Sequence, residues 1–168
     1  MRTVLLFALT AVLLGGCGNK VKRLSAVERD HYYALKVWME DGERKAYLKN
    51  KTEDERNAWL HDNGFWDRFY QYDEAMRQAI IDGDVSDGWT YDQVYMAWGK
   101  PHERKRLTGR KAQRSELLVY RFEVQADGSV VVWQPGSKTA HIAVDLYRIE
   151  LNVDDGVVTE STRRAGWQ

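Results

Sequence analysis

The chain has 168 residues, which is enough for one domain with a sizeable core. Its 25 basic and 25 acidic residues balance, so the overall charge favours no class of partner. Seven Trp and nine Tyr against a single Cys predict a core rich in aromatic side chains and exclude an intramolecular disulfide framework.

The N-terminus carries a candidate export signal. Arg2 supplies a positive charge, and the apolar run over residues 4–14 is too short to span a bilayer, so residues 1–16 are predicted to be a signal peptide. The signal ends in Leu14-Gly15-Gly16-Cys17, which resembles the lipobox of bacterial lipoproteins: an aliphatic residue, two small residues and a cysteine. The resemblance implies cleavage before Cys17 and attachment of a diacylglyceryl group to its sulfur. The alternative is a plain cysteine after an ordinary signal peptide.

Residues 17–24 are predicted to be a basic tether close to the membrane surface. Lys20, Lys22 and Arg23 would be attracted to anionic lipids there. Gly18 follows the cysteine, in place of the aspartate that retains lipoproteins in the inner membrane of some enteric bacteria. We therefore expect a lipid-anchored protein of the cell envelope, at the outer membrane and facing the periplasm.

Residues 25–83 are predicted to form a cluster of short helices. Ser25 with Glu28, and Thr52 with Glu55, have the spacing of a capping box, in which each side chain bonds the backbone N–H of the other residue. The first helix is expected to run to about Met39 and to end at Asp41-Gly42, and the later boundary signals are Asn63-Gly64, Asp73 and Gly83.

The next helix is predicted over residues 90–98. Thr90 and Gln93 form a third capping box, and Gly99 with Pro101 supplies a firm stop. Trp98 is expected to be buried between the helices and a sheet. The aromatic-rich face of this helix contains Tyr91, Val94, Tyr95 and Trp98.

Beyond Pro101 the apolar pattern has a period of two residues, which predicts strands. The expected strands are 103–107 at an edge, 118–124, 130–133, 142–153 and 157–160. The apolar phase of the fourth strand shifts near Leu146-Tyr147, which indicates a bulge there. The short connections favour an antiparallel meander. The predicted fold class is therefore α+β, with a helix cluster followed by one helix and an antiparallel sheet.

The sequence carries few residues suited to catalysis. The four His residues lack the spacing of a metal site, and no nucleophile elbow or phosphate-binding glycine loop is present. We expect a protein that is not an enzyme and that needs no metal or cofactor. The alternative is an envelope hydrolase or ligand-binding protein with a site near His102, Ser115 and Glu116, should these residues meet across strands.

A cluster of basic residues follows Pro101, and export to the envelope argues against a nucleic-acid partner for it. One hypothesis is contact with anionic lipid headgroups or with an acidic partner surface. The other is a solvated edge strand that its charges protect from pairing with further strands. The candidate contact residues are Arg104, Lys105, Arg106, Arg110, Lys111 and Arg114.

The helix and its stop resemble those of the SmpA/OmlA (BamE-like) family of small outer-membrane lipoproteins. The matching residues are Gly88, Thr90, Gln93, Val94, Gly99 and Pro101. The resemblance places a BamE-like domain at residues 84–162 and implies helices packed on a three-stranded antiparallel sheet. It also implies an accessory role in assembling outer-membrane β-barrels, through contacts with other assembly lipoproteins and phospholipid.

The helical half departs from that family and resembles GWxTD-domain proteins instead. Gly88, Trp89 and Asp92 fit the Gly-Trp-x-Thr-Asp motif, although Tyr91 stands where the motif has threonine. Neither resemblance implies a catalyst. We therefore predict an interaction or scaffold module of the envelope, with the membrane and an envelope protein as partners.

Overall fold

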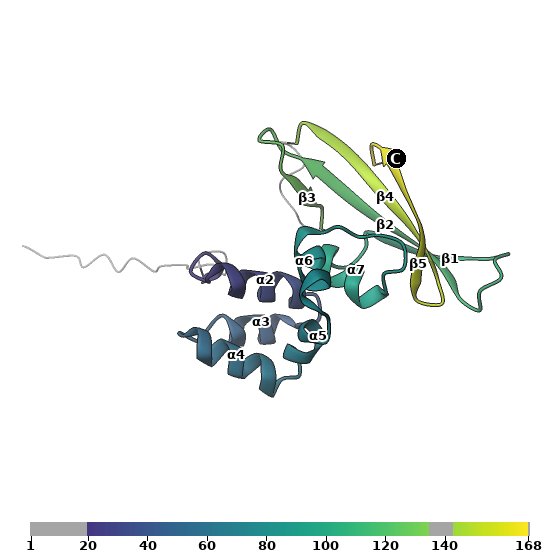
Figure 1. Cartoon of the computed structure of the whole chain (residues 1–168). Coiled ribbons are helices and arrows are strands. Elements are labelled where there is room, and N and C mark those ends of the chain that lie inside the picture. The colour runs from purple at the N-terminus through teal and green to yellow at the C-terminus, as the bar shows by residue number, and fades with distance from the viewer. Residues whose placement is uncertain (1–19, 135–142, 168) are drawn as a thin grey trace, which may run out of the picture.

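The structure is a computed structural model that describes residues 20–134 and 143–167. Over these residues the chain forms six helices followed by a five-stranded antiparallel sheet, which confirms the predicted α+β class. Figure 1 shows α6 and α7 packed beneath the sheet, with α3, α4 and α5 farther from it. The helices are α2 (Ala26–Leu35), α3 (Asp41–Tyr47), α4 (Glu53–Asp62), α5 (Trp66–Tyr70), α6 (Glu74–Asp82) and α7 (Tyr91–Trp98).

The helices begin at the predicted capping residues. The backbone N–H of Glu28 donates to Ser25 Oγ at 3.3 Å, and the backbone N–H of Ser25 donates to the Glu28 carboxylate at 2.7 Å. The same reciprocal bonds join Thr52 and Glu55, each at 3.2 Å. Asp73 caps α6. These local signals are therefore sufficient to start α2, α4 and α6.

The predicted boundary between the first two helices is wrong. Helix α2 ends at Leu35 and does not reach Met39. Asp41-Gly42, expected to end a helix, instead begins α3. The reason is a cap that the sequence analysis missed: Glu40 has an extended backbone, and its N–H donates to the Glu43 carboxylate at 2.8 Å.

The strands pair in the order β1-β2-β4-β5, and β3 pairs with β2 beside this path. All pairs are antiparallel. One connection departs from sequential pairing, because β4 follows β3 in the chain but pairs with β2, placing Val119 opposite Glu150. The strands are β1 (Glu103–Leu107), β2 (Ser115–Val124), β3 (Val130–Val132), β4 (Asp145–Asp154) and β5 (Val157–Ala165).

The sheet corrects two expectations. It has five strands, where the resemblance implied three. The bulge expected at Leu146-Tyr147 is absent, because the register of β4 on β2 is continuous there; the irregularity lies between Asn152 and Val153, where β4 pairs with β5. The two adjacent apolar residues, Leu146 and Tyr147, are explained without a bulge because they lie on opposite faces of the strand. Tyr147 stacks on Phe122 at 4.9 Å, whereas the preceding Leu146 lies on the opposite face of the strand.

Helix α7 is fastened to the hairpin between β4 and β5. The backbone N–H of Gly88 donates to the Val158 carbonyl, and the N–H of Val158 donates to the Trp89 carbonyl, both at 2.8 Å. The N–H of Tyr91 donates to the Gly156 carbonyl at 3.2 Å. A side chain at Gly156 would also lie within 3.7 Å of the Tyr91 ring. These contacts fix where α7 begins relative to the sheet.

Trp98 lies in the core between the helices and the sheet, as predicted. Its ring makes edge contacts with Tyr120 and Phe122 of β2, both at 5.1 Å between centroids. Its indole N–H donates to the Gly83 carbonyl at 3.0 Å, which links α7 to the end of α6. The Tyr120 hydroxyl donates to the Gly99 carbonyl at 3.0 Å. Trp98 therefore joins three elements.

The predicted segments 25–83 and 84–162 share one hydrophobic core. Leu35 and Ile80 of the first segment belong to the same cluster of buried side chains as Tyr120 of the second. The two segments therefore pack as parts of one folded unit in the described chain.

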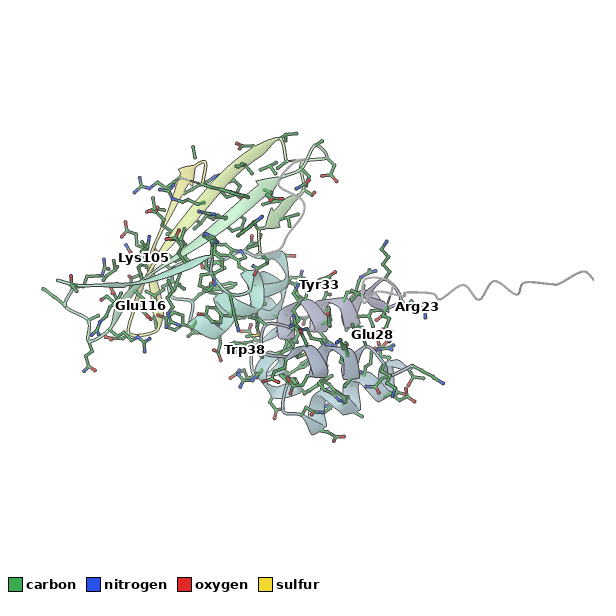
Figure 2. The ribbon with its side chains drawn as sticks, turned by 180° about the vertical axis from the view of Figure 1, so that it is seen from behind. Arg23, Glu28, Tyr33, Trp38, Lys105 and Glu116 are labelled. Carbon is green, nitrogen blue, oxygen red and sulfur yellow. The ribbon has the colours of Figure 1, made fainter. Side chains whose placement is uncertain are left out.

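A buried ion pair joins α2 to α4. The Arg56 guanidinium donates to the Glu28 carboxylate, and Glu28 is 2% exposed. Arg56 also donates to the Asn50 carbonyl at 2.7 Å. Burial alone would raise the pKa of Glu28, but the hydrogen bonds from Arg56 and from the Ser25 N–H, with the Arg56 charge, hold that pKa below its usual value. Glu28 is therefore ionised within the helix cluster, where Figure 2 places it.

Candidate functional site

Two of the predicted contact residues are held by Glu116. Arg104 donates to its carboxylate from Nε at 2.9 Å and from Nη2 at 2.7 Å, and Arg114 donates to it at 3.1 Å. The Tyr91 hydroxyl donates to the same carboxylate. Glu116 is buried on the face of the sheet that α7 covers, and Figure 2 shows Lys105 on the other face. This pairing anchors β1 to β2 and to α7.

The hydrogen bond from Arg104 is the main cause that lowers the pKa of Glu116 to about 2; burial opposes it, and Tyr91 and Arg114 add to it. Because the folded-state pKa is below the unfolded value, Glu116 contributes stability above about pH 4.5 that is lost as the pH falls towards 2. We expect Glu116→Gln to flatten the loss of unfolding free energy between pH 5 and pH 2. Urea denaturation of both proteins across this range measures it, and parallel profiles would contradict it.

The remaining basic residues are partly neutralised as well. Arg110 donates to the Asp154 carboxylate from Nε at 2.9 Å and from Nη2 at 2.7 Å. Lys105 pairs with Glu103 at 2.5 Å. Within residues 20–134 and 143–167, the two that form no ion pair are Arg106 and Lys111. Contact between this segment and an anionic surface stays a prediction, but most of its charge already has an acidic partner.

The alternative site at His102, Ser115 and Glu116 is not assembled. Leu107 lies opposite Ser115, whereas the backbone N–H of His102 donates to the Val119 carbonyl at 2.9 Å. His102 and Ser115 are therefore at opposite ends of the β1–β2 pair, separated by roughly 13 Å along the strand. Ser115 and Glu116 are neighbours in β2 and point to opposite faces. This arrangement provides no nucleophile and base within reach of each other.

The described part of the chain contains no group of three or more His, Cys, Asp or Glu placed to hold a metal ion. His31 is buried among aromatic rings, with Nε2 2.6 Å from the Tyr70 hydroxyl and edge contacts to Trp66 and Phe69. Burial lowers the pKa of His31, so it is a neutral core residue at pH 7. The lipidation candidate Cys17 lies outside the described residues, as do the predicted signal peptide and His141.

A groove with a volume of about 1180 Å³ lies between α2, the α6–α7 pair and β3. Apolar side chains form much of its wall. Four of them are large and exposed: Tyr33, Ile81, Val130 and Val131. Figure 2 shows Tyr33 on the side of α2 that faces the sheet. An apolar surface that stays open in this way is typical of a binding site.

The rim of the groove is basic. Its charged residues are Lys22, Arg29, Lys36, Arg44 and Lys100, against the single acid Asp30. In the described chain none of the three lysines forms an ion pair, whereas Arg44 pairs with Asp41. The groove therefore combines an apolar wall with cations that have no carboxylate partner.

Lys36 is a partly buried cation in the wall of this groove. Its ammonium group lies over the Tyr33 ring, 4.4 Å from the centroid. Burial and the charge of Arg44 both lower the pKa of Lys36. An anionic group placed here would relieve the repulsion between the two cations, so the groove suits a ligand that is both acidic and apolar.

Sequence reasoning missed this groove because its residues are scattered. Lys36 and Lys100 are far apart in the chain, and only the packing of α2 beside α7 brings them to one surface. The one local signal was Tyr33, a large aromatic residue off the apolar stripe of its helix.

No helix in the described residues is long and apolar enough to cross a membrane. Comparisons with family models, with curated proteins and with solved structures each gave no match to this chain.

Proposed function

We propose that the chain is a bacterial envelope lipoprotein, anchored through Cys17, that acts as an interaction module. In this proposal the groove binds an acidic, amphipathic segment of an envelope protein. The lipobox-like sequence supports the anchor, and the groove supports the binding role. Lys22 lies at the rim of the groove and five residues after Cys17, which would keep the groove within roughly 18 Å of the anchored end.

The observation that carries the binding role is the pairing of exposed apolar side chains with unpaired cations in one groove. Amphipathic helices bind grooves of this kind with their apolar face, and acidic residues on the segment would meet the lysine rim. A hydrolase is less well supported, because His102 and Ser115 are far apart. An accessory role in outer-membrane protein assembly rests on the family resemblance, and α7 packed on an antiparallel sheet is consistent with it.

Site-specific photo-crosslinking in native membranes tests the groove. Tyr33 and Val27 lie on the same helix with similar exposed fractions, 51% and 53%, but Tyr33 lines the groove and Val27 does not. A photoreactive residue at position 33 is expected to give a discrete protein adduct that position 27 does not give. Reversing the charge of Lys36 and Lys100 should remove the adduct, because an acidic segment would then be repelled.

The same experiment separates a protein partner from lipid. The adduct should decrease as salt is raised, since exposed charges are screened over shorter distances at high ionic strength. Equal adducts from both positions, or adducts with lipid alone, would contradict the proposed protein-binding groove. Unfolding of the charge-reversed protein is checked by circular dichroism.

The anchor is tested independently at Cys17, the only cysteine in the chain. Cys17→Ser is expected to release the protein into the soluble envelope fraction or to leave it as an uncleaved precursor, because no other thiol can receive the lipid. Partitioning into a detergent phase and the size of the processed chain measure this. Unchanged partitioning and processing would rule out lipidation and would leave the groove to be judged by crosslinking alone.

A further inference from the structure

Strand β5 is the long edge of the sheet. Edge strands are normally short or carry Lys, Pro or bulges that prevent pairing with another chain. The opposite edge fits this rule, because β1 has five residues, three of them basic, and β3 has only three residues. Strand β5 is less protected: it has nine residues, contains no Pro, Gly or Lys, and is rich in β-branched and hydroxyl side chains. Its one irregularity lies opposite Asn152 and Val153, at the start of the strand, and its charges are of both signs, Glu160 with Arg163 and Arg164.

Only the first residues of β5 are covered. Trp89 and Gly88 bond to the backbone of Val158, and Thr90 forms a bridge with Val157. Nothing in the described chain pairs with the outer backbone edge of residues 159–165. This free edge is seven residues long, with Thr162 at its centre.

The last hydrogen bond between β5 and β4 shows which backbone groups of β5 point away from the sheet. The N–H of Gly166 donates to the Leu146 carbonyl at 2.9 Å, so the even-numbered residues back to Glu160 direct their backbone groups towards β4. The N–H and C=O groups of Ser161 and Arg163 therefore point away from the sheet. These groups are donors and acceptors for one more antiparallel strand.

The sequence of the free edge is complementary to itself in one register. If two copies pair antiparallel about Thr162, Ser161 of one copy lies opposite Arg163 of the other, and each pair exchanges two backbone hydrogen bonds. Within one copy, Glu160 accepts from Asn152 at 2.6 Å and Arg164 pairs with Glu150 at 3.4 Å. In the paired register Glu160 also lies opposite Arg164 of the second copy, which places opposite charges side by side twice. The midpoint of the free edge and the midpoint between Glu160 and Arg164 are therefore the same residue, Thr162.

We propose that two copies of this chain pair antiparallel along β5, with Thr162 on the two-fold axis, to form one continuous sheet. The contact is isologous, so it closes as a dimer and does not propagate. It leaves the groove between α2, α7 and β3 open, because β3 lies at the other edge of the sheet. The dimer is therefore independent of the proposed partner binding.

Disulfide trapping tests the register in the full chain in its native membranes. Opposed Thr162 residues would be a pair without mutual backbone bonds, with Cα atoms about 4.5 Å apart, which is within the range of a disulfide. Thr162→Cys is expected to give a covalent dimer on mild oxidation. Ala165→Cys is the matched control, because Ala165 makes no charged contact in the proposed pairing and its two copies would be roughly 20 Å apart, too far to join. The unmodified chain controls for Cys17.

Charge exchange provides a second measurement. Glu160→Arg should raise the dissociation constant of the detergent-solubilised dimer about 5- to 30-fold, since it sets like charges opposite each other twice. Adding Arg164→Glu to it should restore the original value. Sedimentation equilibrium measures both. A chain that stays monomeric at every concentration tested, equal crosslinking from positions 165 and 162, or a double variant no tighter than the single one would overturn the proposed dimer.

Discussion

Replacing Trp98 with alanine is expected to lower the free energy of unfolding by about 3–5 kcal/mol, as is typical when a large buried aromatic side chain is removed. The ring contacts Tyr120 and Phe122 in the sheet, and its N–H bonds the Gly83 carbonyl at the end of α6. The substitution therefore removes contacts between the helices and the sheet and leaves a cavity between them. Urea denaturation followed by far-ultraviolet circular dichroism measures the loss.

Trp98→Phe separates packing from hydrogen bonding at this position. It keeps a six-membered aromatic ring and removes the pyrrole part of the indole with its N–H. We therefore expect it to cost about 1–2 kcal/mol, near the value of one hydrogen bond and a small cavity, which is less than the cost of the alanine variant. A loss below about 1 kcal/mol for Trp98→Ala would contradict the central place of this ring in the core.

Replacing Arg56 with methionine is expected to destabilise the protein by about 3–5 kcal/mol. The substitution leaves the Glu28 carboxylate buried without its cation, and an uncompensated buried charge is costly. The free energy of unfolding at pH 7 measures the effect. Arg44→Met is the matched control, since Arg44 also forms an ion pair but Asp41, its partner, is largely exposed; we expect it to cost no more than about 1 kcal/mol.

The double variant Glu28→Gln with Arg56→Met identifies the cause. Glutamine removes the negative charge and keeps an oxygen that can accept from the Ser25 N–H. If the cost of Arg56→Met comes from the unpaired carboxylate, the double variant should recover a substantial part of the lost stability. Equal losses of unfolding free energy for Arg56→Met and Arg44→Met would show that breaking the buried Glu28–Arg56 pair costs no more than breaking an exposed ion pair.

The helix boundaries could be predicted where the signal is local. The N–H of Thr90 donates to Gln93 Oε1 at 2.7 Å, as the three-residue spacing indicated. Gly83 adopts the left-handed conformation expected after a helix, with φ of 76°. The same reasoning failed at Asp41-Gly42, because a dipeptide typical of turns can also begin a helix when a residue before it supplies the cap.

Pairings between distant residues could not be predicted in the same way. No local pattern indicated that β4 passes β3 and pairs with β2, since this depends on which face each strand buries. Glu28 was assigned to a cap, and Arg56 carried no signal at all, yet together they form a buried ion pair. The candidate site shows the same limit: the basic segment 104–114 was visible as a charge run, but its neutralising partners Glu116 and Asp154 were not.

The attachment of α7 to the β4–β5 hairpin has a consequence for the order of folding. Gly88 and Val158, which bond to each other, are 70 residues apart in the chain. Contacts between such distant residues slow folding, because a long loop must close before they form. If the chain is exported as proposed above, α7 leaves the translocation channel long before its partners on β5 emerge. We therefore expect the apolar face of α7 to need protection by envelope chaperones until nearly the whole chain has been exported.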